Sequence, residues 1–317
     1  MNNGNVKFSV TIPTYKSRFL KNAIESVIAQ TYSNWDLIIV DDASPEDLAT
    51  IVRDFKDPRI RYYRNSKNCG AVNVVDNWNI CLSYCNSEYV ICMGDDDMLA
   101  PCCLEEYVVL IEKYPNLNVY HALTDIVDES GNVIGHQRLR PEYQTVQELI
   151  LHRWYGDVQF IGDFCYRVDY LREIGGYFKQ PLAWASDDIT AVMAAEEGGG
   201  IANTRKVCFL YRENGMSISS NKNNGLKLDA KARERQWFVD FFMRHPDATE
   251  ILYPQAFNSW FNGQIELHLK ALFEESLMNL PSALIKSRRL SLKKKKVFRE
   301  WFKVLKEKEL KWKKEMY

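Results

Sequence analysis

The chain has 317 residues, of which 46% are hydrophobic and 13% aromatic, so disordered and collagen-like chains are excluded. Its formal net charge of −1 averages two unlike parts. Residues 282–317 hold 14 Lys and Arg against 4 Asp and Glu, and the remaining residues hold 27 against 38. A functional interpretation therefore has to explain an acidic body with a basic tail.

Three simple properties limit where the protein works. No apolar run approaches the roughly 18 residues of a membrane-spanning helix. The polar residues 1–7 lead directly into a strand pattern, so no signal peptide is expected. The eight cysteines form no CxxC pair, and we expect them to be buried free thiols in a reducing cytoplasm rather than disulfides or zinc ligands.

The first 125 residues alternate predicted strands and helices. The strands are expected at 8–12, 36–40, 59–64, 88–93 and 118–123, and the helices at 18–30, after Ser44, at 70–85 and at 101–114. Ser44 is expected to cap the second helix, with Pro45 in its first position. Because parallel strands need crossover helices, this order predicts an α/β fold with a doubly wound, mostly parallel sheet.

The pattern changes after residue 125. A hairpin turn is expected at 128–133, and a strand, a helix and a strand at 159–167, 186–197 and 206–211. The polar segment 220–225 reads as a linker, and the rest of the chain has only helical patterns. We therefore predict one domain at 1–222 and a helical extension at 223–317.

Clustered aspartates are the clearest chemical signal. Asp41-Asp42 and Asp95-Asp96-Asp97 each end a predicted strand, where ligands bind in open parallel sheets, and Asp187-Asp188 forms a third cluster. Adjacent carboxylates repel unless a cation or a donor offsets them, and hard oxygens suit Mg²⁺ or Mn²⁺ bound to phosphates. The pattern predicts a divalent-metal diphosphate site. For any single pair, an ordinary role in a loop or cap remains open.

Two common nucleotide motifs are missing. No GxxxxGK[ST] occurs, and Pro13-Thr14-Tyr15 follows the first strand where a dinucleotide site would require glycines. Nucleoside triphosphatases and dehydrogenases are therefore disfavoured.

Taken in order, these motifs resemble glycosyltransferase family 2, the inverting nucleotide-sugar transferases with the GT-A fold. The resemblance covers roughly residues 6–220. It rests on Phe8–Tyr15, Ala23–Tyr32, Asp36–Ser44, Gly94–Pro101, Arg172–Tyr177 and Tyr211–Ser219. Each block is short, but their ordered combination is specific.

The resemblance implies an enzyme that moves a sugar from a nucleoside diphosphate, expected to be UDP, to an acceptor hydroxyl with inversion. The acceptor would be a surface polysaccharide or a lipid-linked glycan. The catalytic domain 1–222 would have a nucleotide-sugar half at about 1–125 and an acceptor half at about 126–222. Mn²⁺ or Mg²⁺ would be the cofactor.

The resemblance also assigns roles to individual residues. The nucleotide would be bound by Pro13, Thr14, Tyr15, Asp42, Asn68, Asp95 and Arg212. Asp42 would accept from the uracil N3–H, and Arg212 would contact the diphosphate. Asp96, together with Asp95, would ligate the metal.

The acceptor side of the reaction would depend on Asp188 as the general base. Its neighbour Asp187 would raise its pKa or orient the acceptor. Trp184 would stack on an acceptor sugar, with an ordinary core role as the alternative.

Four positions depart from the family pattern, and one of them is Trp78, which with Asn79 stands where the third helix commonly has an Arg-Asn pair. Gly94 stands where the metal motif Asp-x-Asp has its first aspartate, which makes the ligand assignment less direct. Asp187 replaces the commoner Glu of the base motif. Asn214 replaces a frequent His, which would remove one diphosphate or metal contact.

The basic tail has two interpretations that the sequence leaves open. Phe298, Trp301, Phe302 and Leu305 form an apolar stripe that follows the lysine run 293–296. Such a helix would lie on an anionic membrane surface or pack on its own protein. The protein would accordingly be cytoplasmic, either free or peripheral on the inner face of the membrane. Nucleic acid is not an expected partner, because the acidic body would repel it.

Two rival functions are weaker. A sugar nucleotidyltransferase would need a glycine-rich loop and a nearby lysine, for which Thr14-Tyr15-Lys16 is a poor substitute. A non-catalytic binding protein would be unaffected by loss of Asp188. The transferred sugar, the acceptor, the linkage and the oligomeric state are not determined by the sequence.

Overall fold

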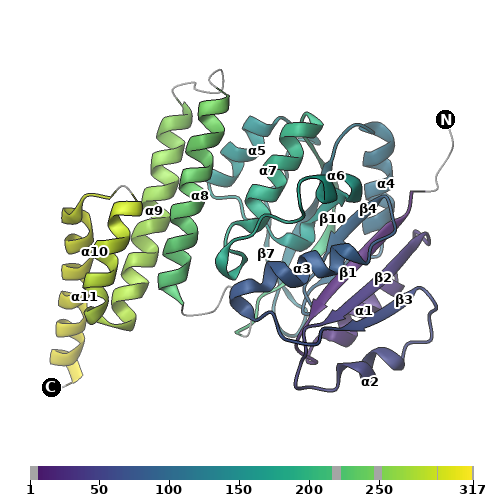
Figure 1. The fold of residues 1–317 in the computed structure, drawn as a ribbon, viewed down its shortest axis with the longest axis horizontal. Coiled ribbons are helices and arrows are strands. Elements are labelled where there is room, and N and C mark those ends of the chain that lie inside the picture. The colour runs from purple at the N-terminus through teal and green to yellow at the C-terminus, as the bar shows by residue number, and fades with distance from the viewer. Residues whose placement is uncertain (1–5, 216–222, 246–251, 291, 316–317) are drawn as a thin grey trace. The chain divides into compact units, whose positions relative to one another are not determined.

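The structure, a computed structural model, describes residues 6–215, 223–245, 252–290 and 292–315 (Figure 1). The chain divides into two compact units, residues 1–217 (unit 1) and 218–317 (unit 2).

Unit 1 is built on a sheet whose described strands run in the order β3-β2-β1-β4-β9-β6-β10-β5, with β7 beside β6 and β8 beside β10. The strands are β1 (Phe8–Thr14), β2 (Trp35–Asp41), β3 (Ile60–Arg64), β4 (Tyr89–Cys92), β5 (Met98–Leu99), β6 (Val119–Val127), β7 (Val133–His136), β8 (Tyr143–Gln144), β9 (Phe164–Arg167) and β10 (Ile201–Arg212). The first four, β1 to β4, are parallel to one another, as predicted. β9 then enters between β4 and β6, antiparallel to both, so the second half of the sheet is mixed.

Helices cover both faces of this sheet (Figure 1). They are α1 (Leu20–Ile28), α2 (Leu48–Arg53), α3 (Val74–Ser83), α4 (Cys103–Lys113), α5 (Val146–Trp154), α6 (Val168–Glu173) and α7 (Ser186–Gly198), with short 3₁₀ turns η1 (Ala71–Asn73), η2 (Ile161–Asp163) and η3 (Pro181–Ala183). On one face, Leu37 and Ile39 of β2 join a core with α1, α2 and α4. The alternate residues Ile38 and Val40 are equally buried, and α3 packs against β2. Burial on both faces explains the continuous apolar run of this strand, and the predicted α/β fold is confirmed.

The predicted start of the second helix was wrong. α2 begins at Leu48, and its N-cap is Asp47, whose side chain accepts from the N–H of Thr50. Ser44 lies in a turn instead, where its hydroxyl accepts from Glu46 N–H at 3.0 Å and donates to Tyr15 O at 2.7 Å. A Ser-Pro pair fits a turn as well as a helix start, and this turn ties the loops after β1 and β2 together.

The cysteine prediction holds for most of the set. All eight cysteines are free thiols, and six of them are buried. Cys69 and Cys102 are half-buried rather than buried, because each lies in a loop at an element end.

A glycine pair after α6 is held by a side chain of α3. Asn79 Oδ1 accepts from Tyr177 N–H at 2.8 Å, and a Cβ on Gly176 would lie 2.2 Å from that same oxygen. Gly175 and Gly176 both have positive φ, at 86° and 98°. The Gly-Gly-Tyr block therefore needs its second glycine for close approach as well as for backbone conformation.

We expect Gly176→Ala to destabilise the protein more than Gly175→Ala. Both substitutions place an L-residue in the left-handed region, at roughly 1–2 kcal/mol. Only position 176 adds a collision with Asn79, since nothing lies within 4 Å of a Cβ at position 175, and overpacking adds about 1–3 kcal/mol. Urea unfolding of the two variants measures the difference, and equal losses would contradict the close-approach argument.

The described residues of unit 2 form helices only. They are α8 (Asn224–Arg244), α9 (Leu252–Glu275), α10 (Leu280–Arg289) and α11 (Lys294–Glu315), with the 3₁₀ turn η6 (Leu277–Asn279). α9 packs against α8 and α11, and α10 packs against α8 and α11. Their core includes Phe238, Phe261, Leu269, Phe273 and Val304, each at most 3% exposed. None of the described helices has the length and hydropathy needed to span a bilayer.

Candidate active site

Three loops meet at the carboxyl edge of the sheet in unit 1. β1 lies between its parallel neighbours β2 and β4, so the segments that follow these strands lie together. The first two loops touch directly, since Asp42 N–H donates to Thr14 O at 2.9 Å. This edge brings together Pro13–Tyr15, Asp41–Asp42 and Asp95–Asp97.

One oxygen of Asp95 organises the loop after β1. Asp95 Oδ2 accepts from Thr14 Oγ1 at 2.9 Å, from Tyr15 N–H at 2.9 Å and from Lys16 N–H at 3.0 Å. Burial, and next the charge of Asp96, raise the pKa of Asp95, and the three donors oppose that shift. Asp95 and the predicted nucleotide loop thus form one hydrogen-bonded unit, in which this oxygen is bound by protein donors.

Asp41 has a structural role. Its side chain is fully buried. Its Oδ2 accepts from Tyr62 Oη at 2.6 Å and forms an ion pair with Arg64, and its Oδ1 accepts from Ser44 N–H at 2.7 Å. All of these partners belong to the adjoining strand or turn, so Asp41 holds the edge of the sheet together.

Asp42 holds the loop that contains Asn68. Asp42 Oδ1 accepts from Asn65 Nδ2 and from Cys69 N–H, both at 2.9 Å. Asn68 Oδ1 accepts in turn from Gly70 N–H. The structure therefore brings these two predicted nucleotide ligands into one cluster, and the bond from Asp42 to a uracil N3–H stays a prediction.

Asp96 and Asp97 turn their carboxylates toward Gly94. A Cβ on Gly94 would lie 2.7 Å from Asp96 Oδ1 and 2.8 Å from Asp97 Oδ2. Burial, and next the charge of Asp96, raise the pKa of Asp97 well above its usual range. Two carboxylate oxygens therefore converge on one point, and glycine at position 94 leaves that point open.

Arg212 holds the turn that contains Asp96 and Asp97 by hydrogen bonds. Its Nε donates to Asp96 O at 2.9 Å, and its Nη1 donates to Asp128 O and Glu129 O at 3.0 Å each. Its backbone N–H donates to Asp97 Oδ1 at 2.9 Å. The sequence predicted a diphosphate contact for Arg212, but its side chain is 3% exposed and is directed at backbone carbonyls. In this structure it is a clamp on the Asp96–Asp97 turn.

Asn214 lies on the same cluster. Its Nδ2 donates to Asp96 Oδ2 at 2.8 Å. Asn214 therefore supplies a donor to the acid cluster, and the expected loss of a diphosphate or metal contact at this position stays a prediction. Residues 216–219, the end of the Tyr211–Ser219 block that resembles the family, lie outside the described residues.

The acid cluster fits a cation that a substrate helps to hold. Within the described ranges, no group of three or more His, Cys, Asp or Glu side chains is arranged to hold a metal ion. Asp96 and Asp97 nevertheless present two converging oxygens, and Mg²⁺ is typically bound by one or two carboxylates together with phosphates and water. Asp96 and Asp97 fit such an ion, and ligation by Asp96 together with Asp95 stays a prediction.

The third acidic pair occupies the first turn of α7. Asp188 is 4% exposed, and its Oδ1 accepts from Arg153 Nε at 2.8 Å and from Gln159 Nε2 at 2.9 Å. Arg140 Nη1 donates to Gln159 Oε1 at 3.0 Å, which directs the amide nitrogen of Gln159 toward Asp188. The donors and the helix N-terminus together stabilise Asp188 as an oriented carboxylate.

Asp187, the other member of this pair, has a raised pKa. Asp187 Oδ1 accepts from Asp188 N–H at 3.0 Å. Burial, and next the charge of Asp188, raise the pKa of Asp187 to about 8, although Arg153 acts in the opposite direction. The expectation that Asp187 raises the pKa of Asp188 or orients the acceptor stays a prediction. A pKa of about 8 favours the protonated form of Asp187 at neutral pH.

A strained segment carries Trp184 into this region. Leu182, Ala183 and Ala185 have φ of 59°, 52° and 66°, a conformation that costs an L-residue roughly 1–2 kcal/mol. Trp184 lies within this run and is half-buried. η3, which precedes it, packs against η1, the turn that follows Asn68. The fold thus links the segment of the acidic pair to the predicted nucleotide loop.

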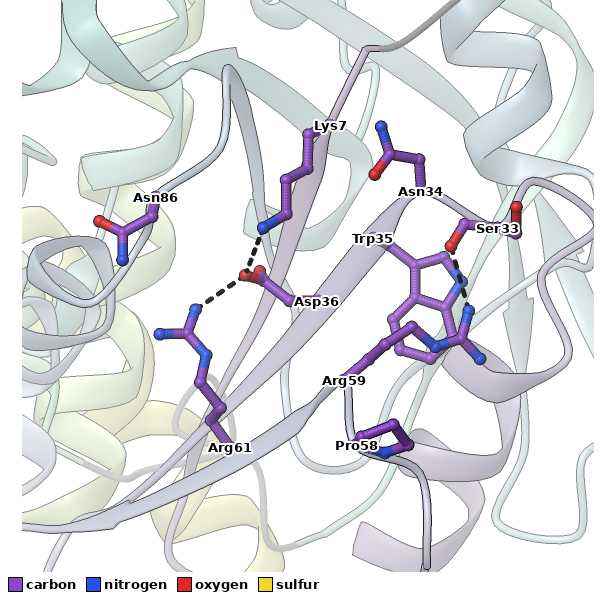
Figure 2. Close-up of a pocket in the computed structure, with 9 residues that line it drawn as sticks. All are labelled: Lys7, Ser33, Asn34, Trp35, Asp36, Pro58, Arg59, Arg61 and Asn86. Atoms are coloured by element: carbon purple, nitrogen blue, oxygen red, sulfur yellow. Dashed lines mark hydrogen bonds and ion pairs between the residues drawn. The ribbon is translucent and has the colours of Figure 1, made fainter.

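A separate pocket lies at the opposite edge of the sheet (Figure 2). Its volume is about 480 Å³, and it is lined by Lys7, Ser33, Asn34, Trp35, Asp36, Pro58, Arg59, Arg61 and Asn86. These residues precede or begin strands β1 to β4, so the pocket is at their amino ends. Asp36 pairs with Lys7 at 3.3 Å and Arg61 at 2.8 Å, and the Arg59 guanidinium stacks 3.5 Å from the Trp35 ring. Arg59 also pairs with Asp57 outside the lining, at 2.6 Å, and the pocket is not part of the acid-rich edge.

Comparison with known proteins agrees with this arrangement. Residues 9–175, more than half of the chain, match the model of glycosyl transferase family 2. The Escherichia coli enzyme WfgD, named UDP-Glc:alpha-D-GlcNAc-diphosphoundecaprenol beta-1,3-glucosyltransferase, is 27% identical over 233 residues, which cover 73% of this chain and 84% of WfgD. WcaA of the same species, named for colanic acid biosynthesis, is 40% identical over 100 residues, which cover 31% of this chain and 35% of WcaA.

Solved structures show the same fold. The crystal structure of S. aureus TarS residues 1–349 with UDP-GlcNAc superposes with a TM-score of 0.59 at 16% identity, covering 94% of this chain and 90% of that chain. Its GT-A sheet with flanking helices corresponds to the mixed sheet described above. From its sequence, its fold and its acid-rich edge, the chain belongs to glycosyl transferase family 2 and is a GT-A glycosyltransferase.

Proposed function

We propose that the protein transfers a sugar from a nucleoside diphosphate sugar, with UDP as the nucleotide, to an acceptor hydroxyl with inversion at the anomeric carbon. The observation that carries this proposal is the pairing of two sites in one unit. One is the pair of carboxylates, Asp96 and Asp97, that converge beside Gly94. The other is Asp188, held by Arg153 and Gln159, with its neighbour Asp187. The first suits a diphosphate leaving group, and the second suits a hydroxyl nucleophile.

The donor would bind across the three loops of the carboxyl edge. Thr14, Tyr15 and Asn68 would line the base and ribose, and Asp42 would accept from the uracil N3–H. Support comes from the shared loop in which Asp42 and Asn68 lie and from the UDP-GlcNAc bound by TarS.

Asp96 and Asp97 would hold Mn²⁺ or Mg²⁺, with the Oδ1 of Asp95 as a further neighbour. The ion, when bound, would neutralise the developing charge on the leaving diphosphate. Arg212 and Asn214 would keep the two carboxylates in position, as their hydrogen bonds to this turn indicate.

Asp188 would act as the general base. The acceptor O–H proton would pass to its carboxylate while the oxygen forms a bond to the anomeric carbon and the bond from that carbon to the diphosphate oxygen breaks. Arg153 and Gln159 would hold the carboxylate, and Trp184 would stack on the acceptor sugar. Neutral Asp187 could donate to the acceptor without repelling Asp188.

The acceptor would be a growing polysaccharide or a sugar carried on a lipid diphosphate. WfgD acts on a diphosphoundecaprenol-linked sugar by name, and WcaA is named for polysaccharide biosynthesis. A lipid-linked acceptor would place the protein on the inner face of the membrane, where the basic tail 282–317 meets anionic lipid.

Release of nucleoside diphosphate tests the proposal directly. The protein would be incubated with UDP-, GDP- and dTDP-sugars in Mn²⁺, Mg²⁺ or EDTA. We expect release from a UDP-sugar that requires the metal, and NMR of the product would show the inverted anomer. A protein that binds and turns over none of the donors would refute the transferase, and pyrophosphate release from a nucleoside triphosphate would identify a nucleotidyltransferase instead.

A further inference from the structure

α11 divides its charged and apolar side chains between two faces. Val297, Glu300 and Val304 are at most 3% exposed, and this face packs against α9. Side chains three and four positions apart share a helix face, so residues 295, 298, 302 and 306 lie on the side away from this contact.

The outward side of α11 combines exposed aromatic rings with exposed lysines. Phe298 and Phe302 are 38% and 52% exposed and follow each other by one turn. Lys295 precedes them and Lys306 follows them, and both are exposed. Single exposed hydrophobic side chains are normal on a protein surface, whereas two rings in line between two cations form an amphipathic strip. We call Lys295, Phe298, Phe302 and Lys306 the outer strip.

The lysines of the outer strip differ from Lys296, Arg299 and Lys303 of the same helix, which have acidic partners. Lys296 pairs with Glu266 at 2.8 Å, Arg299 with the same carboxylate at 3.1 Å, and Lys303 with Glu300 at 3.0 Å. Within the described part of the chain, no acidic partner is present for Lys295 or Lys306. The fold therefore neutralises the basic residues beside α9 and leaves the outer pair available to another anion.

We propose that the outer strip of α11 docks on an anionic lipid bilayer, with Phe298 and Phe302 in the headgroup–acyl boundary and Lys295 and Lys306 on lipid phosphates. This chemistry matches an interfacial helix, in which aromatic rings enter the boundary and lysines meet negative headgroups. Glu309 lies one turn beyond Lys306, and its negative charge would be repelled by an anionic surface, so the strip ends at Lys306.

A second copy of the chain fits this surface less well. A symmetric contact would place the same strip against itself, so the lysines would face like charges around only two rings. Stable dimers bury roughly 1,200–2,000 Å² or more, which a strip of four side chains does not supply.

Vesicle flotation tests the proposal with the full chain. Vesicles of phosphatidylcholine with and without phosphatidylglycerol would be compared, at low and at high salt. We expect binding only to the anionic vesicles, weakened by salt. Phe298→Ser/Phe302→Ser and Lys295→Glu/Lys306→Glu should each reduce binding about tenfold or more.

The matched control is Lys21→Glu/Lys56→Glu, which changes the net charge equally on exposed positions of unit 1 and should bind like wild type. Circular dichroism would verify that each variant is folded. Equal binding by wild type and Lys295→Glu/Lys306→Glu, or no binding by wild type, would overturn the proposal. So would a dimer in light scattering that Phe298→Ser/Phe302→Ser dissociates, since the strip would then be a contact between copies.

The inference rests in part on the proposed function, because a lipid-linked acceptor is the reason to meet a bilayer. Vesicle binding needs neither donor nor acceptor, so the two can fail separately. A protein that floats but releases no nucleoside diphosphate would refute the function alone. An active protein that never floats would refute the docking strip alone.

Discussion

Asp188→Asn is expected to lower kcat by about 10²–10⁴-fold, the usual contribution of a positioned general base, while donor affinity stays within a few fold. Asn keeps the size of the side chain and a carbonyl oxygen for Arg153 and Gln159, but it cannot take the proton of the acceptor. Steady-state kinetics and calorimetric titration with a UDP-sugar would separate the two effects. An Asp188→Asn enzyme with normal kcat would remove Asp188 from the mechanism.

The matched variant Asp187→Asn distinguishes the two members of the pair by pH. Asp187 has a pKa of about 8 in the folded protein, so below that pH a neutral Asn resembles the wild-type side chain. If Asp188 is the base, the two enzymes should have similar rates near neutral pH and diverge only above about pH 8. If Asp187 is the base, the wild-type rate should rise with pH up to about 8 and the variant should lose that rate throughout.

The raised pKa of Asp187 also makes the free energy of unfolding depend on pH. The folded pKa of Asp187 lies above the value of about 3.9 expected in the unfolded chain, so the folded state binds this proton more tightly. Its contribution to the free energy of unfolding therefore declines as the pH rises toward 8. Asp187→Asn should flatten that decline, which urea unfolding at several pH values would detect even in an inactive enzyme.

Gly94→Asp should impair the enzyme, although it restores the commoner Asp-x-Asp order of the family. A Cβ at position 94 would lie 2.7 and 2.8 Å from oxygens of Asp96 and Asp97, so both carboxylates would have to move. Overpacking costs about 1–3 kcal/mol of stability, and displaced carboxylates should hold the metal less well, so we expect kcat/KM to fall. The new carboxylate also adds negative charge where the pKa of Asp97 is already raised.

Gly94→Ala is the control, because it adds the Cβ without the charge. Mn²⁺ titrations of nucleoside diphosphate release would compare the three proteins. We expect the alanine variant to show most of the loss and the aspartate variant to show more. A Gly94→Asp enzyme as active as wild type would mean that the convergence of Asp96 and Asp97 does not matter for metal-dependent transfer.

The two side chains that hold Asp188, Arg153 and Gln159, could not be identified from the sequence. Arg153 and Gln159 are 35 and 29 positions away from Asp188, and neither stands in a recognisable motif. They reach the carboxylate because α5 packs beside α7 and the chain after α5 turns back toward it. Single polar residues give no periodic signal, so only packing identifies their function.

The sequence also did not identify the buried face of α11. The spacing of 298, 301, 302 and 305 correctly predicts an amphipathic helix, but its buried face is formed by Val297, Glu300 and Val304. Trp301 is half-buried, and its Nε1 donates to Leu277 O at 2.9 Å. Both the stripe 298, 301, 302 and 305 and the stripe 297, 300 and 304 have helical spacing. The contact between α9 and α11 buries the second stripe.

The sequence by itself determined the α/β class, the parallel order of β1 to β4 and the acid clusters at the ends of strands. These features follow from local periodicity and from the rule that parallel neighbours end at one edge. The tertiary structure decided which donors each carboxylate meets: Asp41 is held by Tyr62, Arg64 and Ser44, oxygens of Asp96 and Asp97 converge beside Gly94, and burial raises the pKa of Asp187. Those outcomes depend on desolvation and on donors that come from distant segments, and no local pattern encodes either.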